Sequence, residues 1–159
     1  VVARVPDAQV MADLDATAAW AAASGEGDPK RLGITGFCWG GRITWLYATH
    51  NPRLRAGVAW YGRLVGTTTD LQPTEVIALA GRLKAPVLGL YGGKDDGIPL
   101  ESVERMRKAL EAAGSRSRIE VFPDAPHGFH ADYRPTYRAR EAAEGWKQMR
   151  AWFRANGVS

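Results

Sequence analysis

Hydrophobic residues along this chain follow two patterns: short apolar runs, and longer segments in which apolar positions recur every three or four residues. Short runs bounded by Gly or Pro are typical of buried strands, and the longer spacing is typical of helices that cover a core with one face. Helices are predicted over residues 7–23, 40–49, 73–82, 101–113 and 137–156. Strands are predicted over residues 31–37, 55–61, 85–91 and 118–122. Because strands alternate with helices, we expect an α/β fold with one parallel sheet of about four strands, helices on both faces and right-handed crossovers.

Apolar residues recur at helical spacing in three of these helices. In the first helix they are Val10, Met11, Leu14, Ala18 and Ala21, and this spacing predicts the helix. In the fourth helix Val103, Met106, Leu110 and Ala113 form a stripe that covers the sheet, and the last helix is expected to bury Ala142, Trp146, Met149 and Phe153. We expect the tryptophans of the last helix to pack in the core rather than to form a ligand cage.

The chain has one cysteine, and it lies in the segment Gly36-Phe37-Cys38-Trp39-Gly40-Gly41, between a predicted strand and a predicted helix. This spacing matches the nucleophile elbow Gly-x-Ser-x-Gly, in which the glycines let the strand and helix backbones pass close together. The first amides of the following helix would face the sulfur of Cys38 and stabilise a thiolate. A small buried core cysteine is the competing interpretation, and the rest of the chain has to decide between them.

An acid and a histidine follow Cys38 in the order that α/β-hydrolase triads have along their chains. Asp95 comes after the predicted strand 85–91, and His127 comes after the predicted strand 118–122. Loops at the carboxyl ends of parallel strands meet at one edge of the sheet, so we expect these three side chains to converge. His50, by contrast, ends a predicted helix before Asn51-Pro52 and is interpreted as a helix-terminal residue that complements the dipole.

Composition narrows the function classes. The 159 residues are 45% hydrophobic with a formal net charge of +4, and no stretch approaches the length of a membrane span. One cysteine excludes an internal disulfide framework and a multi-cysteine metal site, and we expect no cofactor and no metal. The arginines are spread along helix faces and turns, which favours a solvated surface over a nucleic-acid groove. The first residues are not typical of a signal peptide, so cytoplasmic residence is the default expectation.

The motifs together resemble the dienelactone hydrolase family of the α/β-hydrolase fold, and the resemblance covers essentially the whole chain. They are Gly-Phe-Cys-Trp-Gly-Gly at 36–41, Tyr61-Gly62, Gly92-Gly93-Lys94-Asp95 with Ile98-Pro99, and His127-Gly128-Phe129. The resemblance implies Cys38 as nucleophile, Asp95 as acid and His127 as base. Its Gly-x-x-Asp spacing selects Asp95 over Asp96, and the flanking Pro126 and Gly128 favour His127 over His130.

Further site residues are expected around Cys38. The polar loop 62–72 opens onto the same edge of the sheet as Cys38 and is the candidate for substrate contacts, with Tyr61, Arg63 and Phe129 as the expected substrate-binding residues. The backbone amide of Trp39 would bind the oxyanion. The family's arginine a few residues beyond the histidine is displaced here, because Ala131 and Asp132 follow and the nearest arginine is Arg134.

Family members begin well before the equivalent of Val1, so the chain is similar to the C-terminal two thirds of the family's single domain. The strand at 31–37 would then have a bare edge, to be covered by an upstream segment or by self-association. The second oxyanion amide of the family belongs to that upstream part.

The function predicted from these features is hydrolysis of an activated lactone or ester through a Cys-His-Asp triad and a thioester. A general carboxylesterase or thioesterase is the enzymatic alternative. A catalytically inactive fold fragment that binds a partner at its open edge is the non-enzymatic one. A thiol redox switch is disfavoured because the chain has no resolving cysteine.

Overall fold

The computed structural model describes residues 2–158 and contains one parallel sheet with the strand order β1-β2-β3-β4. The strands are β1 (Gly33–Phe37), β2 (Ala56–Trp60), β3 (Val87–Lys94) and β4 (Arg118–Pro126). The four predicted strands and their parallel pairing are confirmed, with small differences in where they begin and end.

The last two strands extend further than predicted because two glycines let their backbones approach. A Cβ at Gly92 would lie 2.3 Å from the carbonyl oxygen of Ala125, and one at Gly93 would lie 2.4 Å from that of Pro123. The pairing continues to Lys94 and Pro126 across a register shift. The extended pairing brings the segments after β3 and β4, which carry Asp95 and His127, to the same end of the sheet.

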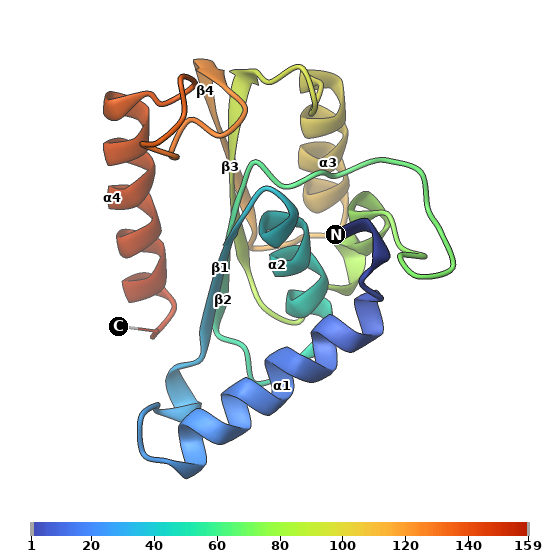
Figure 1. Cartoon of the computed structure of the whole chain (residues 1–159), viewed down its shortest axis with the longest axis vertical. Coiled ribbons are helices and arrows are strands. Elements are labelled where there is room, and N and C mark those ends of the chain that lie inside the picture. Colours follow the sequence, from blue (N-terminus) through green and yellow to red (C-terminus); the bar gives the residue numbers. More distant parts are fainter. Residues whose placement is uncertain (1, 159) are drawn as a thin grey trace.

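Helices cover both faces of the sheet. They are α1 (Asp7–Ala23), α2 (Trp39–His50), α3 (Leu100–Ala112) and α4 (Ala139–Ala155), with 3-10 helices η1 (Val2–Arg4), η2 (Pro29–Arg31) and η3 (Val76–Arg82). In Figure 1, α4 lies on one face, α2 and α3 lie on the other, and α1 runs across the lower end. Within residues 2–158, no helix combines the length and apolar character that crossing a membrane would require.

The helix predicted over 73–82 is instead the 3-10 helix η3. Its second amide, that of Ile77, donates to the carbonyl of Leu64 at 3.1 Å, and the amide of Ala78 bonds three residues back to Glu75. The amides of the first turn therefore bond to the neighbouring loop or to the carbonyl three residues back. The second kind of bond is the one that defines a 3-10 helix.

The core lies on both sides of the sheet and is rich in aromatic rings. Trp45 of α2 is buried against the sheet, and its indole Nε1 donates to the hydroxyl of Tyr91 at 3.1 Å. Tyr47 of α2 is also buried, and its hydroxyl donates to Asp15 of α1 at 3.0 Å. On the other face, α4 approaches closely because Gly145 lies against the ring of Trp60, where a Cβ would meet ring carbons at 2.7 Å. α2 is buried on most sides, since the sheet, α1 and η3 all contact it.

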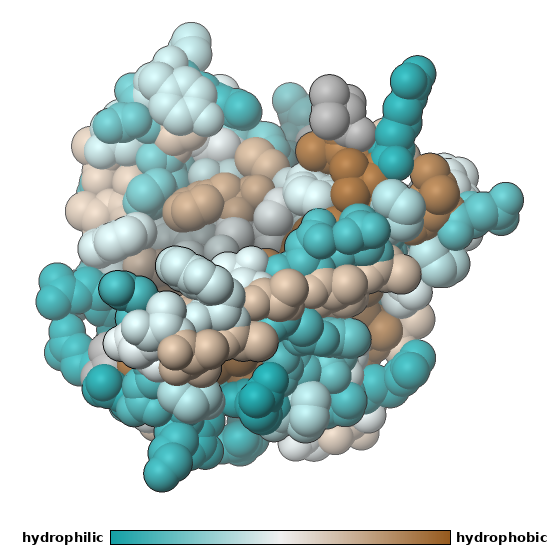
Figure 2. Space-filling model, turned by 60° about the horizontal axis from the view of Figure 1, so that its bottom comes forward, coloured by the Kyte–Doolittle hydropathy of each residue, from teal (hydrophilic) through white to brown (hydrophobic). Residues whose placement is uncertain are grey.

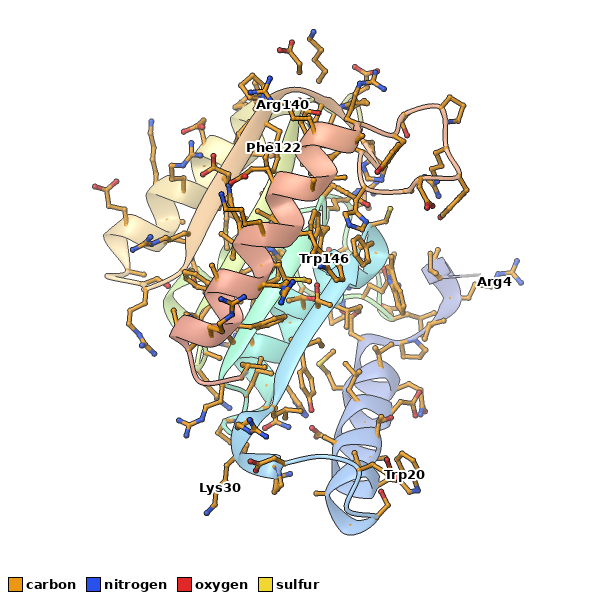
Figure 3. The ribbon with its side chains drawn as sticks, turned by 90° about the vertical axis from the view of Figure 1, so that its left-hand side faces the viewer. Arg4, Trp20, Lys30, Phe122, Arg140 and Trp146 are labelled. Carbon is orange, nitrogen blue, oxygen red and sulfur yellow. The ribbon has the colours of Figure 1, made fainter. Side chains whose placement is uncertain are left out.

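Two expectations about helix faces were wrong. Trp146 is 45% exposed, because α4 buries the positions of Ala142, Gly145 and Met149 and turns Trp146 toward the β1 edge (Figure 3). Ala113 is exposed just beyond the end of α3. The predicted first helix is present as α1, with Met11 buried, Val10 and Leu14 partly buried against the core, and Trp20 exposed at its far end (Figure 3).

Basic side chains gather where the amino ends of the strands meet the carboxyl ends of the helices. A cavity of about 630 Å³ at this end is lined by Lys30, Arg53, Arg55, Lys84 and Arg116. The ammonium of Lys84 donates to the carbonyl of His50, the last residue of α2, at 3.1 Å. Cations at helix carboxyl ends complement the dipoles, which accounts for this surface. Figure 2, in which the lower end comes forward, shows hydrophilic side chains over much of this face.

Candidate active site

Cys38 occupies the sharp bend between β1 and α2. Its backbone has φ +53° and ψ −116°, a conformation that non-glycine residues rarely adopt. A Cβ at Gly36 would lie 2.2 Å from the carbonyl oxygen of Gly40, so the bend requires glycine there. The amide of Cys38 donates to the carbonyl of Trp60 at 3.0 Å, and the carbonyl of Cys38 accepts from the amide of Gly41 at 3.0 Å. These bonds hold the strained residue in place at the end of the sheet.

The structure brings Cys38, His127 and Asp95 into one hydrogen-bonded line. The imidazole Nε2 of His127 lies 3.2 Å from the Sγ of Cys38, and its Nδ1 lies 2.7 Å from an Oδ of Asp95. The other carboxylate oxygen of Asp95 accepts from the amides of Gly97 and Ile98 at 2.9 and 3.0 Å. The carboxylate is therefore oriented by two fixed backbone donors, and both ring nitrogens of His127 have partners.

Asp96 and His130, the sequence neighbours disfavoured as the acid and the base, lie outside this hydrogen-bonded line. Asp96 is exposed next to Asp95. The ring of His130 lies 4.6 Å from that of Trp60 and 5.6 Å from that of Trp146, among aromatic side chains. Burial lowers the pKa of His130 below its ordinary value.

Electrostatics at the line favour a protonated imidazole. The hydrogen bond to Asp95 and then that to Cys38 raise the pKa of His127 from 6.5 to about 9, against the opposing effect of burial. Tyr61 lies beside it, with ring centroids 5.1 Å apart, and is itself buried at φ +37°. Burial, and then the charge of Cys38, raise the pKa of the Tyr61 phenol well above its ordinary value, so this hydroxyl stays neutral.

A cavity of about 450 Å³ opens onto Cys38 and His127. Tyr61 and Arg63 line it, together with Trp39 and the segment that follows β2. Phe129 does not, because it is fully buried beneath the site with its ring 5.3 Å from that of Tyr61. Arg134 lines a second cavity of about 690 Å³, which also reaches Cys38 and Tyr61 and is bounded by Phe37, His130 and Trp146.

Trp39 is the first residue of α2 and lines the cavity of about 450 Å³. Amides in the first turn of a helix have no acceptor within the helix, so they are available to an oxygen bound beside Cys38. The positive end of the helix dipole adds to this effect.

Sequence reasoning missed one buried ion pair, Asp7 and Arg42, of which Arg42 lines the cavity of about 450 Å³. Arg42 contacts the carboxylate of Asp7 through two N–H groups, at 2.6 and 2.8 Å. Nothing in the local pattern distinguishes Arg42 from the other arginines, and Asp7 reads as an ordinary residue of a first helical turn. Only its burial in the fold marks Asp7 as unusual.

A parallel sheet with a cysteine at the strand-to-helix bend, followed by an aspartate and a histidine on later loops, defines an α/β-hydrolase type of fold. A family model described as the dienelactone hydrolase family matches residues 1–157. The chain belongs to the dienelactone hydrolase family.

Relatives match the chain closely and extend beyond it. A protein of Methylorubrum extorquens named "Putative carboxymethylenebutenolidase" is 60% identical over all 159 residues, which are 55% of that protein. An Escherichia coli K12 protein of the same name is 58% identical over 98% of the chain and 57% of its own length. The chain thus spans little more than half the length of these relatives.

Solved structures agree with this assignment. A structure described as "Putative Dienelactone Hydrolase" from Klebsiella pneumoniae has a TM-score of 0.94 at 58% identity, over 97% of this chain and 64% of that one. A puromycin-hydrolyzing peptidase of Mycobacterium tuberculosis has a TM-score of 0.76 at 22% identity, over 92% of this chain and 25% of that one. The second likeness concerns the fold alone.

Proposed function

We propose that this chain carries the catalytic machinery of a hydrolase that opens activated esters or lactones through a thioester on Cys38. The observation that supports this most directly is the hydrogen-bonded line from the sulfur of Cys38 through His127 to the buried carboxylate of Asp95. Membership of the dienelactone hydrolase family supports the ester or lactone class.

The first half-reaction forms a carbon–sulfur bond. His127 takes the thiol proton of Cys38 on Nε2, which lies 3.2 Å from the sulfur. The hydrogen bonds to Asp95 and Cys38 raise the pKa of His127 to about 9, so the ring can hold this proton at neutral pH. The sulfur attacks the carbonyl carbon, and the resulting oxyanion accepts a hydrogen bond from the amide of Trp39. The carbon–oxygen bond then breaks, and His127 gives its proton to the departing oxygen. In a lactone that oxygen stays attached to the acyl part.

The second half-reaction consumes water. His127, now neutral, takes a proton from a water molecule whose oxygen attacks the thioester carbonyl. The carbon–sulfur bond breaks, and the products are the carboxylic acid and the regenerated Cys38–His127 pair. Asp95 holds Nδ1 of His127 throughout, which keeps Nε2 directed at the sulfur and stabilises the imidazolium.

The chemistry of sulfur selects the substrate class. A thiolate is a strong nucleophile but also a good leaving group, so it expels weakly basic oxygens such as enolates and phenolates more readily than amines. An amide would therefore tend to revert to the starting complex. Activated lactones and aryl esters are the substrates to assay, with acyl thioesters and plain alkyl esters as the panel that tests for a broader esterase.

The test uses Cys38→Ser, Asp95→Asn and His127→Ala, each assayed on a dienelactone and on 4-nitrophenyl acetate. We expect all three to lose activity, and the wild-type protein to show an acyl adduct on Cys38 by mass spectrometry after rapid quenching. Asp96→Asn and His50→Ala are matched controls, because they remove the same groups outside the line. Unchanged rates in the first three variants would refute the assignment.

A further inference from the structure

The guanidinium of Arg42 lies where three segments meet at the wall of the cavity. Its two N–H groups contact both oxygens of Asp7 at the start of α1, at 2.6 and 2.8 Å. One of them also donates to the carbonyl of Thr74 at 3.0 Å. Both charged side chains are only 12% exposed. The contact therefore joins α1, α2 and the segment after β2 within one buried cluster.

Arg42 is also attached to the bend that carries Cys38. Its backbone amide donates to the carbonyl of Cys38 at 3.3 Å, in the first turn of α2. The main chain of Arg42 therefore bonds to the backbone of Cys38, and its side chain bonds to Thr74 in the far wall of the cavity. A planar guanidinium that meets a carboxylate with two parallel bonds has a defined orientation, which a single contact lacks.

The far wall is the segment 63–75, which we call the wall loop. Nine of its residues line the cavity beside Cys38, in two groups, the run from Arg63 to Thr68 and the residues Gln72, Thr74 and Glu75. Much of this loop is exposed, and residues 63–75 form no helix or strand; η3 begins directly after them. Its geometry therefore depends on the contacts made at its ends and middle.

The beginning of the wall loop is held by the burial of Leu64 and by its bond from the amide of Ile77, and the middle of the loop is tied to residues at and before the start of α1. The amide of Asp7 donates to the carbonyl of Leu71 at 2.8 Å, and the side-chain amide of Gln72 donates to the carbonyls of Val2 and Val5 at 2.9 and 3.2 Å. A further bond, from the amide of Gly66 to Glu75 at 3.0 Å, is internal to the loop. The Asp7–Arg42 contact connects this whole assembly to the helix that begins at the nucleophile.

We infer that Asp7 and Arg42 are positioning residues that set the distance between the wall loop and Cys38 and so determine which acyl groups the cavity binds. This inference rests on the proposed function for its activity readout. Removing one member leaves a buried charge without its partner, which favours any rearrangement that exposes it to water. The wall loop is the least constrained of the three segments and is the one expected to move.

The test compares 4-nitrophenyl acetate, which has a short acyl group, with 4-nitrophenyl hexanoate, whose longer acyl chain occupies more of the cavity that the wall loop lines. In Arg42→Met and in the milder Asp7→Asn, we expect the ratio of kcat/KM for hexanoate to that for acetate to fall about 10-fold, as expected for loss of a charge-assisted hydrogen bond. The fall should come from KM rather than from kcat. Arg42→Lys, which keeps the charge but not the fork, should recover part of the ratio.

A second readout does not depend on hydrolysis. Trypsin cleavage after Arg63, within the wall loop, should be about 10-fold faster in Arg42→Met than in the wild type under native conditions. Arg31→Met serves as the matched control, because it removes an exposed ion pair with Asp28 (3.0 Å) at the other end of the sheet. Circular dichroism of each variant shows whether the fold is retained, and Asp7→Asn replaces Arg42→Met if the latter does not fold.

The outcomes separate the two proposals. Faster cleavage at Arg63 with an unchanged acyl ratio would overturn the role in specificity, and unchanged cleavage would overturn the tether itself. If the wild-type protein hydrolyses neither ester, the proposed function fails, while cleavage at Arg63 still decides whether Asp7 and Arg42 hold the wall loop.

Discussion

Two Asp–His pairs of nearly equal geometry lie at opposite ends of this sheet. Asp95 and His127 are 2.7 Å apart at the carboxyl end, and Asp15 and His50 are 2.6 Å apart at the amino end, between α1 and α2. The side chain of Asp95 is 1% exposed, whereas that of Asp15 is 41% exposed. In the first pair the other ring nitrogen reaches the sulfur of Cys38. In the second pair the ring lies against Tyr47.

The difference shows that the surroundings, and not the pair, determine what an Asp–His contact can do. At the first pair, the hydrogen bond to Asp95 and then that to Cys38 raise the pKa of His127 to about 9, although burial of the ring opposes the rise. Around Asp15, the hydrogen bond from His50 lowers the pKa of the carboxyl group, while water screens the attraction. The second pair also accepts bonds from Tyr47 and Asn51 at 3.0 and 2.9 Å, so it attaches α1 to the end of α2.

The largest contrast between the two pairs concerns their histidines. His127→Gln should lower kcat/KM for 4-nitrophenyl acetate by about 10⁴-fold, the upper range for loss of a general acid–base, because the sulfur loses its proton acceptor. His50→Gln should leave the rate within about 2-fold, because it lies outside the cavity. Equal losses in both variants would show that the line through Cys38 has no special role.

The aspartates should give a smaller contrast of the same sign. Asp95→Asn keeps the volume but removes the charge that stabilises the imidazolium, and kcat should fall about 100-fold. Asp15→Asn should not alter kcat. Stopped-flow measurement of the acylation burst locates the loss in the first half-reaction, and a defect confined to KM would contradict the proposed role of Asp95.

The pH dependence of stability provides a third test. The pKa of His127 is raised in the folded state from 6.5 to about 9, so its charge stabilises the fold fully below about pH 6.5, and that contribution is lost as the pH rises through 9. The free energy of unfolding of the wild type should therefore exceed that of His127→Gln at pH 6 by more than at pH 9.5. Urea titrations of both proteins at the two pH values measure the difference. A gap that is constant with pH would show that the ring is not charged in the folded protein.

The smallest expected effect belongs to the exposed pair. Asp15→Ala should lower the free energy of unfolding by about 1 kcal/mol or less, because both partners of the ion pair are well exposed and screened. The pKa of Asp15 is lowered in the folded state, so this contribution is present above about pH 4 and is lost as the pH falls. Urea titrations in low and in high salt should show a smaller difference at high salt. A loss of several kcal/mol would mean that the attachment of α1 depends on the Asp15 cluster far more than its exposure indicates.

Much of the fold and the main features of the site could be predicted from local pattern. The strands and the bend at Cys38 follow from short apolar runs and the two glycines around the bend, which are properties of adjacent residues. The meeting of Asp95 and His127 with Cys38 follows from one further rule, that parallel strands collect their carboxyl-end loops at one edge. The face of α4 was harder to predict, because the close approach of Gly145 to Trp60 displaces the buried stripe and leaves Trp146 at the surface.

By itself, the sequence determined the parallel α/β order, the sharp bend that presents Cys38, and the family to which the chain belongs. These depend on residue types at short fixed spacings, where backbone sterics and hydrophobic periodicity act directly. Only the tertiary structure decided that Phe129 lies beneath the cavity, that Asp7 and Arg42 form a buried pair, and that one of two similar Asp–His contacts is shielded from water. Burial and partner choice depend on which distant segments pack together, and that information is not carried by any local pattern.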